Sequence, residues 1–473
     1  MRTTLLPLLS PLMAPLMALV LAAHPAAQEA MPNFGDARAR ELAELGRLPT
    51  SHDVVVRDIV NYRRHRLPLP RADEDVALDL RFDRSFARPE ERVVLQVGYT
   101  TRSEGDRAFV QPVSIALVVD CSGSMSERGK MDQVKRGLCA FVQRLRNDDE
   151  VELIAFSTEA RVVAERRPRG RDPGWLLDLI DALQPDNSTN LHAGLMLGLR
   201  HLKSDGHRDA DPSRARRVVL LTDGIANEGV TDPAQILADA RPFMDASIDI
   251  STIGVGENLD VNLLEKLARG TRGLFHFVGD EKDVQKVFVQ EAESLLMPVA
   301  RRPRLEITLP RDLRVEHVFQ EAWRERDGQI VVDLPDFNAG VTGVVIVRCR
   351  VAQTAREELP ARAELTFEVA ATSRRSTTRA SAELRLGSVD RRLETDLEVQ
   401  KNHAIAVLAQ GLRDMAEASE AKRWTDADRA LRLARDEAQR LFPDNDPDVQ
   451  RVRDMAANYA RTLQRYVDRF RDY

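Results

Sequence analysis

Short, nearly continuous apolar runs alternate with helix-like stretches between residue 112 and about residue 298, and this pattern is the strongest constraint on the fold. The runs are IALVV, VELIAF, RVVLLT, IDISTIGV and LFHFV. Runs without polar alternation indicate strands that are covered on both faces, as in a parallel sheet. One intervening helix is clear, because a single stripe carries the apolar residues Val134, Leu138, Phe141, Val142 and Leu145. The predicted fold class is therefore α/β, with a doubly wound, mostly parallel sheet.

A different pattern lies on both sides of this region. Apolar and polar residues alternate in VALDLRFD and ERVVLQVGYTT before it, and in QIVVDLP, TGVVIVRCRV, AELTFEVAA and ASAELRLG after it. Such alternation indicates half-buried strands of antiparallel sheets. We expect the strands within residues 76–110 to join those of residues 299–388 in one β-sandwich. The α/β domain, residues 112–298, would then be an insertion in that sandwich.

The remaining segments lie near the two ends of the chain. Ala, Leu, Arg and Glu dominate residues 389–473, which predicts a C-terminal helical region. The stretch FPDNDPD interrupts it, and there Asp446 can cap a helix whose first turn contains Pro447. Residues 28–75 form an N-terminal segment with one short amphipathic piece, which is ended by prolines.

Residues 1–27 have the pattern of a secretory signal peptide, with one arginine, an apolar stretch and then small residues. Prolines at positions 7, 11 and 15 leave the uninterrupted apolar part too short to span a bilayer. No later segment approaches the roughly 20 apolar residues that a spanning helix needs. We therefore expect an exported protein of the periplasm or extracellular space, in a bacterial envelope, with no membrane span in the mature chain.

Charge and cysteine content restrict the class of partner. The chain has 69 Lys and Arg against 75 Asp and Glu, a net charge of -6, and the two signs are interspersed. A nucleic-acid partner is therefore not expected, because phosphate binding needs a positive excess on one face. The three cysteines, Cys121, Cys139 and Cys349, cannot all pair within one chain, so this is not a disulfide scaffold.

Oxygen-bearing side chains follow two of the predicted strands and precede a predicted helix. Asp120, Ser122 and Ser124 leave the run SIALVVD, Asp223 leaves VVLLTDG, and Thr189 precedes a helix. Loops at the carboxyl ends of such strands form the crevice in which doubly wound sheets bind ligands. Two carboxylates and three hydroxyls suit a hard divalent cation such as Mg²⁺. Because hydroxyls are neutral donors, the ion would keep positive charge that could attract an acidic group of a partner.

The same residues carry a resemblance to a known family. DCSGSM resembles the Asp-x-Ser-x-Ser pattern of von Willebrand factor type A domains, and Thr189 and Asp223 match the other two parts of that family's metal-ion-dependent adhesion site. The resemblance covers about residues 112–298 and implies a Rossmann-like α/β fold. It also implies that Ser122, Ser124 and Thr189 ligate Mg²⁺, that Asp120 and Asp223 often act through water, and that a partner's carboxylate completes the shell. Mn²⁺ or Ca²⁺ remain alternatives, and the flanking layout resembles bacterial exported proteins of this type and, less closely, inter-alpha-trypsin inhibitor heavy chains.

Enzymatic alternatives find less support in the sequence. GSMSERGK resembles a phosphate-binding loop, but five residues separate Gly123 from Gly129, and Met131 stands where Ser or Thr is needed. His192 and His276 show no metal-ligand spacing, and each is expected to be a helix-face or core residue. We therefore expect a metal-dependent protein-binding protein and not an enzyme. Two alternatives stay open: a metal-dependent hydrolase of the envelope, and an envelope scaffold in which the metal site is secondary.

Overall fold

The structure is a computed structural model, and it describes most of the chain. The described residues are 34–103, 112–203, 214–256, 259–271, 273–278, 287–289, 291–292, 298–320, 323–326, 328–372, 374–387 and 395–471. The predicted signal peptide, residues 1–27, lies outside them. Within the described residues, no helix is long and apolar enough to cross a membrane.

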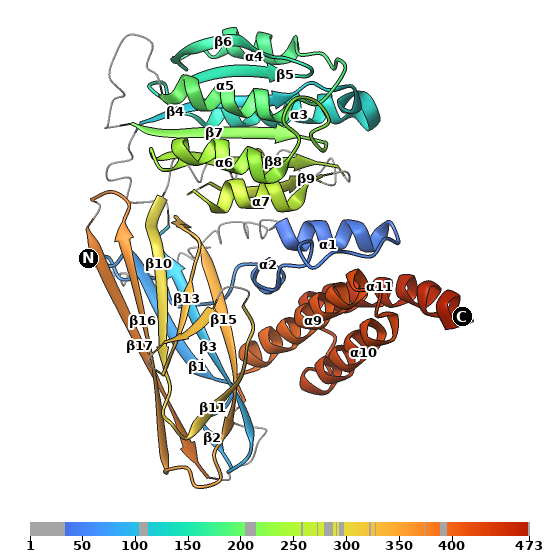
Figure 1. The fold of residues 1–473 in the computed structure, drawn as a ribbon. Helices are drawn as coiled ribbons and strands as arrows, with labels where there is room; N and C mark the ends of the chain where they lie inside the picture. Colours follow the sequence, from blue (N-terminus) through green and yellow to red (C-terminus); the bar gives the residue numbers. More distant parts are fainter. Residues whose placement is uncertain are drawn as a thin grey trace, which may run out of the picture.

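A six-stranded sheet forms the centre of the α/β domain (Figure 1). Its strand order is β6-β5-β4-β7-β8-β9, and only the edge strand β6 runs antiparallel to its neighbour. The strands are β4 (Val113–Asp120), β5 (Glu150–Phe156), β6 (Ala160–Pro168), β7 (Ala215–Thr222), β8 (Ile248–Val255) and β9 (Phe275–Val278). β4 is therefore the central strand from which the chain winds in both directions.

Helices cover both faces of this sheet. The helices are α3 (Lys130–Arg144), α4 (Gly174–Asp181), α5 (Leu191–Lys203), α6 (Pro233–Met244) and α7 (Val261–Arg269). Along β4, Ile115 and Leu117 enter the core under α3 and α4, whereas Ala116 and Val118 enter the core under the other three helices. All four side chains are fully buried. The continuous apolar run thus serves two cores at once, and the predicted doubly wound α/β fold is confirmed.

Two sheets form a β-sandwich beside the α/β domain, and their strands pair antiparallel except for the short edge strand β2, which runs parallel to β17 (Figure 1). The first contains β1 (Val76–Phe82), β3 (Arg92–Thr101), β11 (Leu313–Val318) and β15 (Thr342–Val351). The second contains β2 (Phe86–Ala87), β10 (Pro298–Thr308), β12 (Trp323–Arg326), β13 (Gln329–Asp333), β14 (Phe337–Asn338), β16 (Glu358–Val369) and β17 (Arg375–Leu386). β3 pairs with β15 from Arg92 to Thr100, so strands from before and after the α/β domain share one sheet.

The chain leaves the sandwich and returns to it at nearly the same place. At the end of β3, the hydroxyl of Thr101 donates to the carbonyl of Asn338 at 2.7 Å. Asn338, in the short strand β14, is also the register partner of Pro298, the first residue of β10. Both connections to the α/β domain therefore start beside β14.

β3 differs from the half-buried strand that its alternating pattern predicts. Nine of its ten residues are buried. Leu95 and Val97 face the sandwich core, while Val94 on the opposite side enters a second core made largely of helices. The side-chain amide of Asn402 also donates to Gln96 from that side, at 2.8 Å. The expectation of a half-buried strand was wrong here because helices cover the outer face of the sheet.

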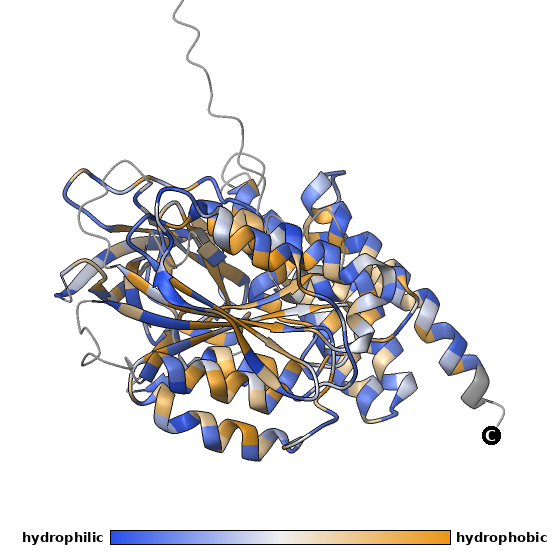
Figure 2. Cartoon of the chain, turned by 90° about the horizontal axis from the view of Figure 1, so that it is seen from above, coloured by the Kyte–Doolittle hydropathy of each residue, from blue (hydrophilic) through white to orange (hydrophobic). Residues whose placement is uncertain are grey.

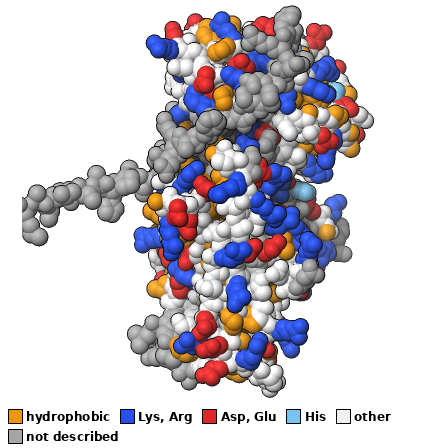
Figure 3. All heavy atoms as spheres, turned by 90° about the vertical axis from the view of Figure 1, so that its left-hand side faces the viewer, with side chains coloured by type: hydrophobic (Ala, Val, Ile, Leu, Met, Phe, Trp, Pro, Cys, Tyr) orange, Lys and Arg blue, Asp and Glu red, His pale blue; other side chains and the backbone are white. Residues whose placement is uncertain are grey.

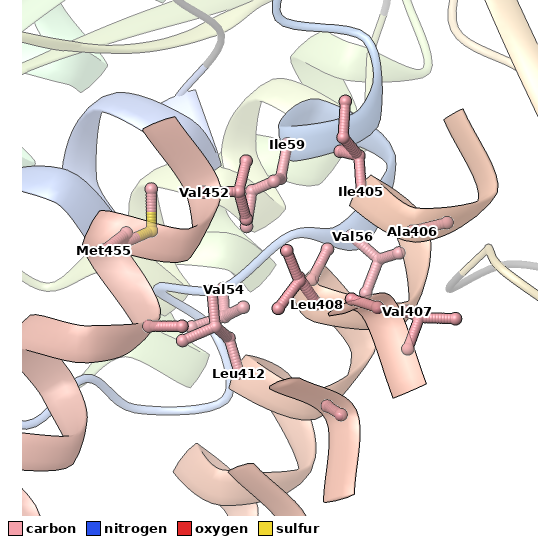
Figure 4. Close-up of a cluster of buried hydrophobic side chains, with 14 of the residues drawn as sticks. Val54, Val56, Ile59, Ile405, Ala406, Val407, Leu408, Leu412, Val452 and Met455 are labelled. Atoms are coloured by element: carbon pink, nitrogen blue, oxygen red, sulfur yellow. The ribbon is translucent and has the colours of Figure 1, made fainter. Parts of the chain in front are cut away.

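The core behind β3, which we call the helical core, joins the two ends of the described chain (Figure 4). Its helices are α1 (Phe34–Glu44), α2 (Val56–Val60), α9 (Leu397–Glu420), α10 (Trp424–Leu441) and α11 (Pro447–Arg471). The fully buried Tyr459 of α11 donates its hydroxyl hydrogen to the carbonyl of Ala39 in α1. As expected, Asp446 caps α11, since its carboxylate accepts from the backbone N–H of Asp448 at 2.9 Å. The N-terminal segment is thus a structural part of the helical region.

The N-terminal helices also contact the α/β domain. The guanidinium of Arg38 lies over the ring of Phe277 in β9, 5.0 Å from its centre. Val55 packs with Phe277 and with Val261 of α7. In Figure 1, α1 and α2 accordingly lie between the α/β domain and the C-terminal helices. The segment therefore connects both parts.

Hydropathy and charge follow this arrangement. Figure 2 shows hydrophobic colour along the strands and on the helix faces that turn toward them. On the molecular face in Figure 3, basic and acidic side chains are interspersed. Side chains of both signs on one face agree with the interspersed charges of the sequence.

Candidate functional site

The predicted site residues come from neighbouring strand ends. Asp120 is the last residue of β4, and Thr222 is the last residue of β7, directly before Asp223. In the parallel register of these strands, Val119 lies opposite Leu221, so the two ends are level. β5 pairs with the opposite edge of β4. The site therefore lies at the strand ends where the winding reverses, which is where open α/β sheets bind ligands.

Asp120 is fixed by hydrogen bonds to both of its carboxylate oxygens. Oδ1 accepts from the backbone N–H of Ser122 at 2.8 Å, and Oδ2 accepts from the hydroxyl of Thr222 at 2.6 Å. The side chain is fully buried. Burial raises the pKa of Asp120 to about 6, although the hydrogen bonds from Ser122 and Thr222 act to lower it. Asp120 therefore holds the turn that carries the two serines.

The two serine hydroxyls and the second carboxylate converge. The hydroxyl oxygens of Ser122 and Ser124 lie 3.1 Å apart. The hydroxyl of Ser124 donates to Oδ1 of Asp223 at 2.7 Å, across 99 positions of sequence. Ser122 and Asp223 are each about 1% exposed. Three of the five predicted residues thus form one chain of oxygen atoms.

Thr189 reaches the same edge from the loop before α5. Its backbone N–H donates to the side-chain oxygen of Asn227 at 2.8 Å, and the N–H of Asn227 returns a bond to its carbonyl at 3.1 Å. Its hydroxyl oxygen lies 3.8 Å from where a Cβ on Gly224 would stand. Because Gly224 directly follows Asp223, the hydroxyl of Thr189 lies next to the chain that carries the second carboxylate.

The loop before α5 is also bonded to the turn after β4. The N–H of Gly123 donates to the carbonyl of Asn187 at 2.9 Å, and the N–H of Asp186 donates to the carbonyl of Cys121 at 2.6 Å. Each pair among the three loops is therefore joined by hydrogen bonds. The structure brings all five predicted residues together at one edge of the sheet.

A lysine that the sequence analysis did not assign to the site also lies there. Nζ of Lys130, the first residue of α3, donates to Oδ2 of Asp223 at 2.5 Å and to the carbonyl of Ser124 at 3.4 Å. In the sequence, Lys130 appeared only as part of a phosphate-binding pattern that failed. The sequence feature that could have placed Lys130 in the site is its short separation from Asp120. The turn between the two residues brings the chain back to the end of β4.

The donor set fits a hard cation. It consists of two carboxylates and three hydroxyls, all oxygen ligands of the kind that Mg²⁺, Mn²⁺ and Ca²⁺ accept. The ammonium of Lys130 pairs with Asp223 at 2.5 Å, so this carboxylate already has one cationic partner. In the described part of the chain, no three or more His, Cys, Asp or Glu side chains form a group that could hold a metal. An ion at this edge would therefore depend on the hydroxyls as well as the carboxylates.

Two histidines pair with carboxylates outside the predicted site, and the thiol of Cys121 is buried in the turn after β4. His192 pairs with Asp239 on α6 at 2.9 Å, and the buried His276 pairs with Glu291 at 2.9 Å. Cys121 is a free, buried thiol, and burial raises its pKa to about 12. The two histidines thus occupy the helix-face and core positions expected of them.

The comparisons with known proteins agree with this geometry. Residues 114–290 match the sequence model of the von Willebrand factor type A domain. The inserted α/β unit of this chain is therefore a von Willebrand factor type A domain.

Relatives and solved structures extend the comparison. The chain is 25% identical over 296 residues to the Escherichia coli (strain K12) protein YfbK, covering 61% of this chain and 48% of YfbK. It is 29% identical over 198 residues to mouse inter-alpha-trypsin inhibitor heavy chain H3, covering 40% of this chain and 22% of that protein. The chain thus spans less than half the length of either relative. A von Willebrand factor type A structure from Catenulispora acidiphila shares the fold with a TM-score of 0.54 and 17% identity, over 79% of this chain and 88% of that one.

Proposed function

We propose that this chain is an exported, metal-dependent protein-binding protein. Its von Willebrand factor type A domain holds a divalent cation, Mg²⁺ in the first instance, through Asp120, Ser122, Ser124, Thr189 and Asp223. The cation engages an acidic side chain of a partner protein. The observation that carries the proposal is the pairwise bonding of three distant loops, above all the bond of 2.7 Å from Ser124 to Asp223.

The roles within the site follow from burial and hydrogen bonding. The hydroxyls of Ser122, Ser124 and Thr189 are the neutral ligands. Each hydroxyl oxygen would offer the ion a lone pair that is free or that is released from a hydrogen bond. Asp120 has both oxygens engaged, so it positions the turn and contributes negative charge. When bound, the cation supplies positive charge and a coordination position for the partner's carboxylate.

Calorimetric titration of Mg²⁺ into the full-length protein tests the metal site. We expect wild type to bind and Ser124→Ala to bind at least about tenfold more weakly, since one ligand is a contribution of at least roughly 1.4 kcal/mol. Asp232→Asn is the matched control, because this exposed aspartate is not one of the five site residues and its carboxylate accepts from the N–H of Gln235 at the start of α6. Equal heats from wild type, Ser124→Ala and Asp223→Asn would reject the proposed site.

A hydrolase of the same fold receives less support. A general base needs a free oxygen or nitrogen near the attacking water. Asp120 has the raised pKa that such a base requires, but both of its oxygens already accept hydrogen bonds and the side chain is fully buried. His192 pairs with Asp239 on α6. Binding is therefore the activity that this arrangement supports best.

The scaffold alternative requires a test that preserves the fold. Removing residues 389–473 would expose the core that α9, α10 and α11 share with α1 and α2, so a deletion would confuse unfolding with loss of contact. Exposed residues of the helices are better targets, such as Leu433, which is 60% exposed. If the Leu433→Ser variant no longer bound a partner protein that the Ser124→Ala variant still bound, the helices and not the metal site would carry recognition.

A further inference from the structure

Lys130 holds the outer oxygen of the second site carboxylate. The two oxygens of Asp223 are divided between two partners: Oδ1 accepts from Ser124 at 2.7 Å, and Oδ2 accepts from Nζ of Lys130 at 2.5 Å. The Asp223 side chain is 0% exposed, and that of Lys130 is 15% exposed. A carboxylate at this depth is costly to keep charged without a cationic partner. The ammonium of Lys130 therefore gives the buried carboxylate of Asp223 a cationic partner within the protein itself.

The path of the lysine is set by a neighbouring strand end. Gly256 follows β8 with a φ of +81°, a conformation that glycine adopts without strain. A Cβ on Gly256 would lie 3.2 Å from Cε and 3.7 Å from Nζ of Lys130. The lysine stem thus passes close over this glycine on its way to Asp223. The ammonium of Lys130 reaches the edge of the site because Lys130 begins α3 and because Gly256 has no side chain in the path of its stem.

The charges of the site can be counted from these contacts. Asp120 and Asp223 contribute two negative charges and Lys130 one positive charge, so these three groups carry a net charge of -1 without metal. The carboxylate of Glu127 also lies 4.0 Å from Nζ of Lys130, but this side chain is 68% exposed, so water and salt screen its charge. A divalent cation would change this sum to +1. Without the lysine, the loaded site would be neutral and would attract an anionic group less strongly.

We propose that Lys130 is a built-in counter-cation that competes with the divalent cation for Asp223 and leaves the loaded site positively charged. This inference rests on the proposed function. Lys130 stabilises the domain when no metal is bound, weakens metal binding by repulsion, and preserves the positive charge that an acidic partner needs. It is a positioning residue, because it acts on the ion through Asp223.

The test compares wild type, Lys130→Met and Lys130→Gln as full-length proteins. Calorimetry measures the affinity for Mg²⁺ alone, and thermal unfolding is recorded in chelator and in saturating Mg²⁺. We expect both variants to melt at lower temperature in chelator and yet to bind Mg²⁺ roughly tenfold more tightly, since a repulsive charge has been removed. The loss in melting temperature should therefore shrink when Mg²⁺ is added. Lys135→Met is the matched control, because Lys135 lies on the same helix and donates instead to the carbonyl of Asp181.

The possible results separate the two proposals. A lysine with only a structural role would lower the melting temperature equally in chelator and in Mg²⁺, and would not tighten metal binding. Weaker or unchanged Mg²⁺ binding in both variants, while wild type binds, would overturn the inference and leave the proposed function intact. Absence of Mg²⁺ binding in wild type would overturn both. If Lys130→Met does not fold, Lys130→Gln answers the question, since its amide can still donate to Asp223 without carrying charge.

Discussion

Glutamine in place of Glu291 should destabilise the von Willebrand factor type A domain in a pH-dependent way. Glu291 is fully buried in a helical segment that follows β9. One carboxylate oxygen pairs with Arg217 of β7 at 3.2 Å, and the other lies 2.9 Å from Nε2 of His276 in β9. The carboxylate thus fastens this helical segment to two strands of the sheet.

The magnitude follows from the pKa of Glu291. Burial acts to raise it, but the hydrogen bond with His276 and the charge of Arg217 outweigh burial and lower it from 4.5 to about 2. A lowered pKa means that the charged form stabilises the folded state above pH 4.5, and that this contribution is lost as the pH falls from 4.5 through about 2. The shift corresponds to about 3 kcal/mol near pH 7 and about 1.5 kcal/mol near pH 3.

Urea unfolding, read by pulsed hydrogen exchange of peptides from β8 and β9, measures the stability of this domain within the full chain. We expect Glu291→Gln to lower the free energy of unfolding by about 3 kcal/mol near pH 7 and by roughly half as much near pH 3. Glu127→Gln is the control, because the Glu127 side chain is 68% exposed. This substitution removes the same charge, but from the surface. A loss of the same size at both pH values would show that Glu291 stabilises the domain by shape and not by charge.

Further predictions concern packing and capping. Gly194→Ala would place a Cβ 2.5 Å from Cδ1 of Phe156, and we expect a loss of about 1 to 3 kcal/mol in urea unfolding; unchanged stability would contradict the close contact. Asp232→Ala removes the carboxylate that accepts from the N–H of Gln235 at 3.0 Å, and should cost about 1 kcal/mol, whereas Asp232→Asn should cost less. Leu408→Ala removes most of a fully buried side chain from the helical core and should lower the free energy of unfolding by about 2 to 5 kcal/mol. Relative to wild type, hydrogen exchange should become faster in α9 than in β4; an equal increase in both would argue against separate cores.

Much of the fold and the assembly of the site could be predicted because strand ends are encoded locally. The apolar run before Asp120 is fully buried on both faces, which is the condition for a central parallel strand. Once the sheet is doubly wound, residues after β4 and β7 must meet at one edge. Asp120, Ser124 and Asp223 could therefore be placed together from sequence alone. Whether they bind a metal stays a prediction.

The features that sequence reasoning missed depend on distant partners. α1 and α2 gain their burial from α9 and α11, and the bond from Tyr459 to Ala39 spans 420 positions. β6 was not predicted, because only one of its nine residues is buried and such an edge strand has no strong apolar pattern. No motif around Lys130 or Asn227 predicts a place in the site. Their roles come from contacts made only in the folded chain, Lys130 with Asp223 and Asn227 with Thr189.

The position of the inserted domain has a consequence for how such a protein can diversify. Because Thr101 and Pro298 both meet Asn338, excising the segment between them would leave two chain ends that a short peptide can rejoin. Closing so small a gap costs the sandwich little entropy, whatever the size of the unit that bridges it. A different domain could therefore be inserted at this junction while the host sandwich folds as before. The architecture makes the von Willebrand factor type A domain a unit that can be exchanged without rebuilding the sandwich.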